Sequence, residues 1–403
     1  MRLSSQSNKF KSMVQSIEFI DQGGIILSSR SGIVASVVIV IIVFSAVGGY
    51  VFLTNQYVPS NIAVVVINPG FGDRSMADQA YQGLHLVDVV VSYDIRVAAD
   101  LTALQSTLES IAQRSNHDLI LVIGTEVGLR DVVITVANEY PNQKFGFVGG
   151  FIDLPNVASA TFAYNEASFL AGALAAHLAV ENDNRTGVVG IIGSVAADPT
   201  VAEMITGFLD GLDYANQTLG EVKLLPIEYV NSYNDSATAQ ELATDMWNPE
   251  IGNASVIFAP VRASIMGIRA AMEIANETWF WDIKNREPFV IGAEADQRYL
   301  GNPNIEIAAG PTWLVTSIVP RSDLAIYRMI NATLWGDFLG SRNYARVPLG
   351  ESANEGGNLE NEGIGLSDLL EFQDLNAQWV TSAQANMTRD YRLMIINGSI
   401  IVP

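Results

Sequence analysis

The sequence predicts an α/β protein with two doubly wound parallel-sheet lobes, preceded by one N-terminal transmembrane helix. Short β-branched runs alternate with longer amphipathic segments after Pro59, and the alternation starts again near Gly187, which indicates two consecutive halves. An uncharged stretch comes before the first half. Hydrophobic residues make up 49% of the 403 residues, enough to bury a large core, so a disordered chain is excluded.

Residues 33–53 have the length and composition of a membrane-spanning helix. They carry no charge, and at 1.5 Å per residue they would cover the roughly 30 Å of a bilayer core. Four basic residues precede them and none follows before Arg74, so the positive-inside rule places residues 1–32 in the cytoplasm and the bulk of the chain outside the cell. A cleaved secretory signal is the alternative, but the apolar run is longer than the usual signal core.

The predicted cytoplasmic tail, residues 1–32, has apolar residues at helical spacing between Phe10 and Ile20. A short amphipathic helix of this kind would lie on the lipid of the inner membrane surface. A loosely ordered tail is the other interpretation.

The alternation of strands and helices defines the order of the two halves. The first half is expected to have strands at residues 62–67, 87–91, 118–123 and 144–148 and helices at 73–86, 98–114 and 126–139. The second is expected to have strands at 187–192, 223–230, 255–259 and 288–291 and helices at 200–214, 237–247 and 264–275. We assign residues 60–163 and roughly 293–320 to the first lobe, and 164–292 and roughly 321–403 to the second. The glycine-rich segment 350–363 is expected to be a mobile surface loop.

Composition excludes several classes of function. The chain has 22 Lys and Arg against 43 Asp and Glu, a formal net charge of −21, which argues against binding to nucleic acid. The absence of cysteine excludes disulfides, cysteine nucleophiles and a lipid anchor on cysteine. Three dispersed histidines do not form a metal-ligand pattern, so we predict neither a metal nor a cofactor.

The turn after the first strand, residues 68–75, is the first candidate for ligand binding. It lies at the carboxyl edge of a parallel sheet, where open α/β folds bind their ligands. Asp73 or Ser75 would cap the following helix and leave free N–H donors nearby. An ordinary capped turn is the alternative interpretation.

Several short motifs, in order along the chain, give the sequence a family resemblance. The most specific are Ser168-Phe169-Leu170-Ala171-Gly172 and Asp296-Gln297, and they are accompanied by Gly72-Asp73-Arg74-Ser75 and Ser232-Tyr233-x-Asp235. In these motifs the chain resembles the basic membrane protein family of substrate-binding proteins. The resemblance implies a type I periplasmic-binding-protein fold that delivers a nucleoside-like solute to the permease of an ABC transporter.

The resemblance also implies where the solute binds. Glu294 stands where the family has an aspartate for the ribose hydroxyls, and Met76 and Met204 stand where aromatic side chains cover the base. Methionine offers an adaptable apolar contact in their place, although both methionines could instead fill the core. The predicted ligand-binding residues are Asn68, Asp73, Ser75, Met76, Asp131, Met204, Glu294 and Asp296.

Two other classes of function remain open. Glu294 and Asp296 could form an acid–base pair in an enzyme, but no nucleophile or metal set accompanies them, and we predict that the protein is not an enzyme. A surface protein with a structural or sensory role could have kept the fold and lost the ligand. Glycosylation is expected, and it would suit a binding role as well as a structural role on an archaeal surface. The expected outer region carries sequons at Asn184, Asn216, Asn234, Asn253, Asn276, Asn331, Asn386 and Asn397.

Overall fold

The computed structural model describes residues 60–87, 91–181, 183–284, 286–302, 312–345, 358, 360–367 and 380–403. The predicted tail at residues 1–32 and the predicted transmembrane helix at 33–53 lie outside these residues, as does most of the expected loop at 350–363. Within the described ranges, no helix is long and apolar enough to cross a membrane. The structure therefore reports on the region that follows Pro59.

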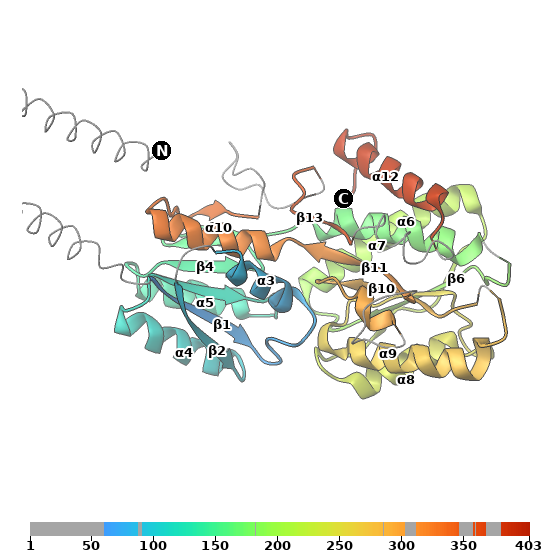
Figure 1. Cartoon of the computed structure of the whole chain (residues 1–403), viewed down its shortest axis with the longest axis horizontal. Coiled ribbons are helices and arrows are strands. Elements are labelled where there is room, and N and C mark those ends of the chain that lie inside the picture. The colour runs from blue at the N-terminus through green and yellow to red at the C-terminus, as the bar shows by residue number, and fades with distance from the viewer. Residues whose placement is uncertain are drawn as a thin grey trace, which may run out of the picture. The chain divides into compact units, whose positions relative to one another are not determined.

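Two sheets form the two lobes of this region (Figure 1). The first sheet has the order β12-β5-β4-β3-β1-β2 and is parallel throughout. Its strands are β1 (Ser60–Ile67), β2 (Val91–Ala98), β3 (Leu119–Ile123), β4 (Phe145–Val148), β5 (Val157–Ala160) and β12 (Arg342–Asn343). The prediction of a doubly wound first lobe is confirmed, since the order 2-1-3-4-5 is the flavodoxin-like arrangement.

The second sheet repeats this arrangement, with the order β13-β11-β10-β9-β6-β7 and β8 also paired to β6. β13 is antiparallel to β11, while the other pairs are parallel. The strands are β6 (Val188–Gly193), β7 (Lys223–Leu224), β8 (Glu228–Tyr229), β9 (Val256–Phe258), β10 (Phe289–Ala293), β11 (Leu314–Pro320) and β13 (Ile364–Leu366). The strand predicted at residues 223–230 is thus two short strands.

Helices cover both faces of each sheet. α3 (Met76–His85), α4 (Leu101–Arg114), α5 (Leu129–Glu139) and α10 (Ser322–Trp335) pack on the first sheet, and α6 (Tyr164–Val180), α7 (Pro199–Leu219), α8 (Ser236–Trp247), α9 (Ile265–Ala275) and α12 (Ser382–Ile396) belong to the second lobe. Alternate residues of β1 show why. Val64 packs in the core with Met76, whereas Val65 packs on the opposite face with Leu104. A strand covered on both faces requires the continuous apolar run from which it was predicted.

The second strand of the first lobe differs from the prediction. The most apolar run near it is residues 87–91, yet β2 covers Val91–Ala98 and exposes Ser92 and Arg96. β2 lies at the edge of the sheet and pairs only with β1, so one side of it faces solvent. Apolar content alone therefore misplaces an edge strand.

The division of the chain between the lobes also needs a correction. We expected residues 293–320 in the first lobe, but β11 pairs with β10 in the second sheet. Conversely, α10 packs against α3 of the first lobe, and β12 joins the first sheet. Leu314–Ile318 are fully buried, so β11 needs an interior position in a sheet, which the neighbour of β10 provides. The chain crosses between the lobes after β5, after β11, and a third time between β12 of the first sheet and β13 of the second.

Candidate functional site

The candidate site lies where the carboxyl ends of strands from the two sheets face each other. Turns after β1 and β3 approach from the first lobe, and segments after β6, β9 and β10 approach from the second. A small cavity of about 10 Å³ separates them. Its polar lining comes from Asp73, Ser75, Glu126, Arg262 and Glu294, and Met76 adds an apolar side.

Arg262 is the centre of this site. It lies in the short helix η1 (Arg262–Ser264) after β9 and is only 3% exposed to solvent. On the first lobe, its Nη1 donates to Glu126 Oε1 at 2.6 Å and its Nη2 donates to Thr125 Oγ1. On its own lobe, Nε lies 3.0 Å from Glu294 Oε2 and Nη2 lies 3.4 Å from Asp198 Oδ2. One guanidinium therefore bridges both lobes.

Asp198 and Tyr233 hold the guanidinium from the second lobe. Asp198 is fully buried and caps α7, accepting from the Thr200 N–H at 2.8 Å. The Tyr233 hydroxyl donates to Asp198 Oδ2 at 3.0 Å, and the Arg262 guanidinium carbon lies 4.3 Å from the Tyr233 ring centroid. This distance is within the range of a cation–π interaction. The cation is thus enclosed by carboxylates and one aromatic face.

The turn after β1 supplies the opposite wall. Gly70 and Gly72 have φ values of 70° and 90°, which let the backbone fold sharply without a side-chain clash. Asp73 then turns inward, where its carboxylate accepts from the Ser75 N–H at 2.9 Å and from the Ser75 hydroxyl at 2.6 Å. Gln297 of the second lobe donates from Nε2 to the Arg74 carbonyl at 2.7 Å, which gives a second polar bridge between the lobes.

Burial raises the pKa values of two carboxyl groups in the site. Burial raises the pKa of Glu294 to about 7; Arg262 opposes this shift, but Asp198, Asp73 and Glu126 reinforce it. Burial likewise raises the pKa of Asp73 to about 6, against the hydrogen bonds from Ser75. One cation thus faces four acidic side chains in a site with little water. In the described part of the chain, no group of three His, Asp or Glu side chains has the arrangement of a metal site.

The structure brings together four of the eight predicted ligand-binding residues: Asp73, Ser75, Met76 and Glu294. The others lie elsewhere, so the candidate site is smaller than the predicted set. Asn68 is exposed in the turn, and the Asp131 side chain is 82% exposed on α5. Met204 is fully buried in the core, as its alternative interpretation expected. Asp296 pairs with Arg298 at 2.7 Å and lines a different pocket.

Five residues of the site were not identified from the sequence: Thr125, Glu126, Asp198, Tyr233 and Arg262. Thr125 and Glu126 follow β3, and Arg262 follows β9, just as the turn with Asp73 follows β1. The rule that placed Asp73 at a strand end would therefore have found them if it had been applied to every strand. Tyr233 stood in a quoted motif, but nothing in that motif indicated its partner Asp198.

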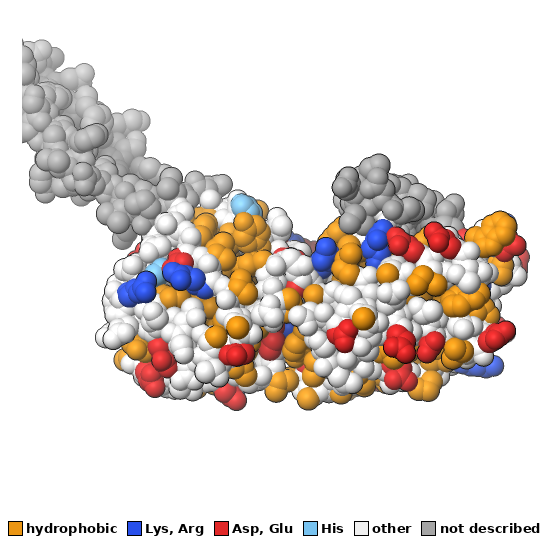
Figure 2. Space-filling view, turned by 90° about the horizontal axis from the view of Figure 1, so that it is seen from below, with side chains coloured by type: hydrophobic (Ala, Val, Ile, Leu, Met, Phe, Trp, Pro, Cys, Tyr) orange, Lys and Arg blue, Asp and Glu red, His pale blue; other side chains and the backbone are white. Residues whose placement is uncertain are grey.

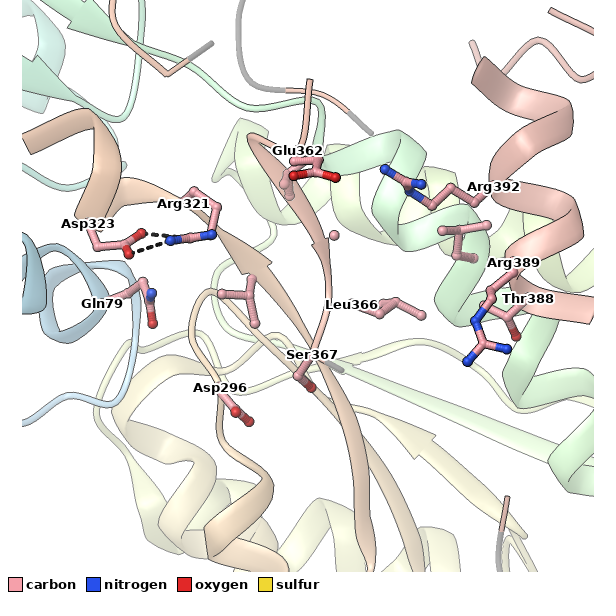
Figure 3. Close-up of a pocket in the computed structure, with 14 residues that line it drawn as sticks. Gln79, Asp296, Arg321, Asp323, Glu362, Leu366, Ser367, Thr388, Arg389 and Arg392 are labelled. Atoms are coloured by element: carbon pink, nitrogen blue, oxygen red, sulfur yellow. Dashed lines mark hydrogen bonds and ion pairs between the residues drawn. The ribbon is translucent and has the colours of Figure 1, made fainter. Parts of the chain in front are cut away.

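A larger pocket of about 730 Å³ lies along β11, β13 and α12 (Figure 3). Arg389 and Arg392 line it from α12, and on the opposite side Arg321 forms a two-point ion pair with Asp323, with distances of 2.9 Å. Along the walls of this pocket, cationic side chains form pairs with acidic ones or alternate with them. The strand ends of the two sheets do not converge on this pocket. We therefore take the cavity at Arg262 as the candidate site. Elsewhere, acidic side chains are scattered over both lobes on the face shown in Figure 2.

Two doubly wound lobes whose strand ends enclose a polar cavity define a two-lobed solute-binding protein. The family model Bmp, described as ABC transporter substrate-binding protein PnrA-like, matches residues 60–346. The match covers more than half of the chain, so the protein belongs to the Bmp family of ABC-transporter substrate-binding proteins, which are not enzymes. The predicted resemblance is confirmed. Glu294 and Asp296 line different cavities, so these two carboxylates do not form the acid–base pair considered from the sequence.

Individual relatives agree with this membership. The chain is 26% identical over 355 residues to a CD4+ T-cell-stimulating antigen of Listeria innocua, covering 85% of this chain and 87% of the relative. It is 25% identical to the ABC transporter nucleoside-binding protein BmpA of Lactococcus lactis, covering 85% and 88%. The crystal structure of an ABC transporter solute-binding protein from Aeropyrum pernix superimposes with a TM-score of 0.71 at 21% identity, covering 86% and 94%, and confirms the fold.

The raised pKa of Glu294 predicts how stability depends on pH. The folded protein holds this proton more tightly than the unfolded chain, so the free energy of unfolding should fall as the pH rises from about 4.5 to about 7. The fall should be on the order of 2 kcal/mol. Glu294→Gln should reduce this slope in urea unfolding of the full-length protein, because the amide does not titrate, and the part due to Asp73 should remain.

Glu273→Gln is the matched control, because Glu273 forms an ion pair with Arg269 at 2.7 Å on the surface of α9 and its side chain is 47% exposed. It should keep the wild-type slope. An unchanged slope in Glu294→Gln would show that Glu294 does not titrate in this window.

Proposed function

We propose that the protein binds a nucleoside-like solute between its lobes, outside the cell, and delivers it to the permease of an ABC transporter. The observation that carries the proposal is the convergence of carboxylates from both lobes, Asp73 and Glu126 from the first and Glu294 from the second, on one buried cavity. Carboxylate oxygens accept hydrogen bonds from sugar hydroxyls. The nucleoside class is further supported by the similarity to the nucleoside-binding protein BmpA of Lactococcus lactis.

Within this proposal, each residue has a different role. Glu294 accepts from the vicinal hydroxyls of the ribose, and Asp73, fixed by Ser75, accepts from a second donor of the solute. Met76 is 2% exposed and provides the apolar contact for the base from the first lobe. Met204 lies too deep in the core for this role and is left out.

A second candidate is a structural or sensory surface protein that kept the fold and lost its ligand. The size of the cavity favours this candidate, since about 10 Å³ holds no more than one water molecule. The two functions differ in whether the lobes open to admit a solute. Calorimetric titration with nucleosides, sugars and amino acids separates them, because silence across all three classes would favour the second.

The proposed ribose contact predicts a selective loss of affinity. Glu294→Ala should lower the affinity for a purine ribonucleoside by at least about tenfold, because removing a charged acceptor from a buried contact costs roughly 1.5–3 kcal/mol. A 2′,3′-dideoxy analogue lacks these hydroxyls, so its affinity should change little in Glu294→Ala. Asp131→Ala, which changes an exposed side chain on α5, should leave both affinities unchanged. Equal losses for both ligands in Glu294→Ala would contradict the sugar contact and assign Glu294 to the fold.

The membrane anchor is a further part of the proposal. Residues 33–53 would tether the protein to the membrane, because the chain has no cysteine to carry a lipid and the basic residues precede this segment. About six residues separate the segment from β1, so the lobes would stay close to the bilayer and the permease.

This topology predicts that protease added to intact cells digests the region after Pro59 and spares the tail at residues 1–32. Mass spectrometry should find sugar at the exposed sequons Asn184, Asn386 and Asn397. The half-buried Asn253, whose side-chain oxygen accepts from the buried Arg286 at 2.6 Å, should be modified less. Asn216, Asn276 and Asn331 are half-buried and should be modified less. Protection of the large region from protease would contradict the orientation.

A further inference from the structure

We propose that Arg262 is an interlobe latch, which holds the lobes together until a solute displaces its guanidinium from the first lobe. The latch belongs to the protein without solute and goes beyond the proposed function. Its competition with the solute rests on the proposed function, because it assumes that the solute enters this cavity. The two parts are therefore tested by separate measurements.

The contacts of Arg262 divide between the lobes in the way that a latch requires. The residue belongs to the second lobe, where Asp198 and Glu294 accept from it at 3.4 and 3.0 Å. Its other acceptors, Thr125 and Glu126, belong to the first lobe. Separation of the lobes breaks only the second set, so the guanidinium keeps two carboxylate partners and never becomes an unpaired charge. The latch can therefore open at a moderate cost.

The backbone at the latch is held in an unusual conformation. Arg262 has φ of 51° and its partner Glu294 has φ of 70°, both in the left-handed region that side-chain-bearing residues rarely adopt. Strained backbone of this kind concentrates at ligand clamps and switch regions. Two such residues in direct contact, one after β9 and one after β10, indicate that the fold positions this ion pair for more than stability.

The space around the guanidinium makes solute binding an exchange. The cavity beside it measures about 10 Å³, so a solute cannot enter while Arg262 spans the lobes. Among the described residues, the buried Oε2 of Glu126 has no hydrogen-bond partner, and Oε1 loses its partner when the guanidinium leaves. A solute must then donate hydrogen bonds to Glu126. A vicinal diol meets this requirement, while a solute edge with only acceptors leaves the carboxylate unpaired.

The natural absence of cysteine makes the latch directly measurable. Spin labels on Ser110→Cys in α4 and Glu241→Cys in α8 report the distance between the lobes of the full-length protein, since both positions are exposed. Without solute, the protein with intact Arg262 should give a short and narrow distance distribution. Arg262→Ala should give a longer and broader one. Arg269→Ala is the control, because it removes an arginine whose partner Glu273 lies on the same helix; its distribution should match that of the parent.

Chemical rescue distinguishes a latch from a folding defect. Methylguanidinium at low millimolar concentration should return the Arg262→Ala distribution toward the short distance, because it refills the site between Glu126 and Glu294. Urea has a similar shape without the charge and should not. An Arg262→Ala distribution equal to that of the parent, or one that methylguanidinium does not shorten, would overturn the latch.

Calorimetry with a purine nucleoside tests the competition. Arg262→Ala should bind at least about threefold more tightly than the wild type, because the binding-competent open state is no longer depleted by the latch. Weaker or equal binding would overturn the competition. If neither protein binds the nucleoside, the proposed function fails. The distance measurements still show whether Arg262 holds the lobes together.

Discussion

One buried guanidinium is the centre of the polar contacts between the two lobes. Arg262 joins acidic side chains of both lobes, and its burial is tolerable only because each face of the cation has a partner. Burial alone would lower the pKa of the guanidinium. Glu294, Glu126 and Asp198 raise this pKa by more than burial lowers it, so the cation stays charged. Burial raises the pKa values of Glu294 and Asp73, and for Glu294 the neighbouring Asp198, Asp73 and Glu126 add to the shift. The site is thus short of donors, which a polar solute could supply.

The fold creates this situation by its topology. In a doubly wound sheet every parallel strand ends at the same edge, and two such lobes turn these edges toward each other. Turns after five strands then bring polar side chains into one small volume while the strands themselves remain buried in apolar cores. The crossings after β5 and β11 connect the lobes with short segments. A change at these segments would alter the approach of the two edges without disturbing either core.

The sequence was sufficient for the parts of the fold that repeat. Continuous apolar strands such as β1 and β3 are buried on both faces, and their composition alone locates them. β2 was misplaced because an edge strand needs no such run, and β11 was assigned to the wrong lobe because its apolar sequence fits an interior position in either sheet. Asp73 and Glu294 were found from strand ends and from the family resemblance. Arg262 was not, because its role depends on acidic partners that lie 32, 64 and 136 residues away in the chain, and no local pattern records them.

A crystal structure of the full-length protein with a purine nucleoside tests the central claim most directly. The account predicts the solute between the two sheets, with ribose hydroxyls within hydrogen-bond distance of Glu294, the base against Met76, and the Arg262 guanidinium withdrawn from Thr125 and Glu126. A nucleoside bound instead in the pocket between β13 and α12, with Arg262 still spanning the lobes, would contradict it.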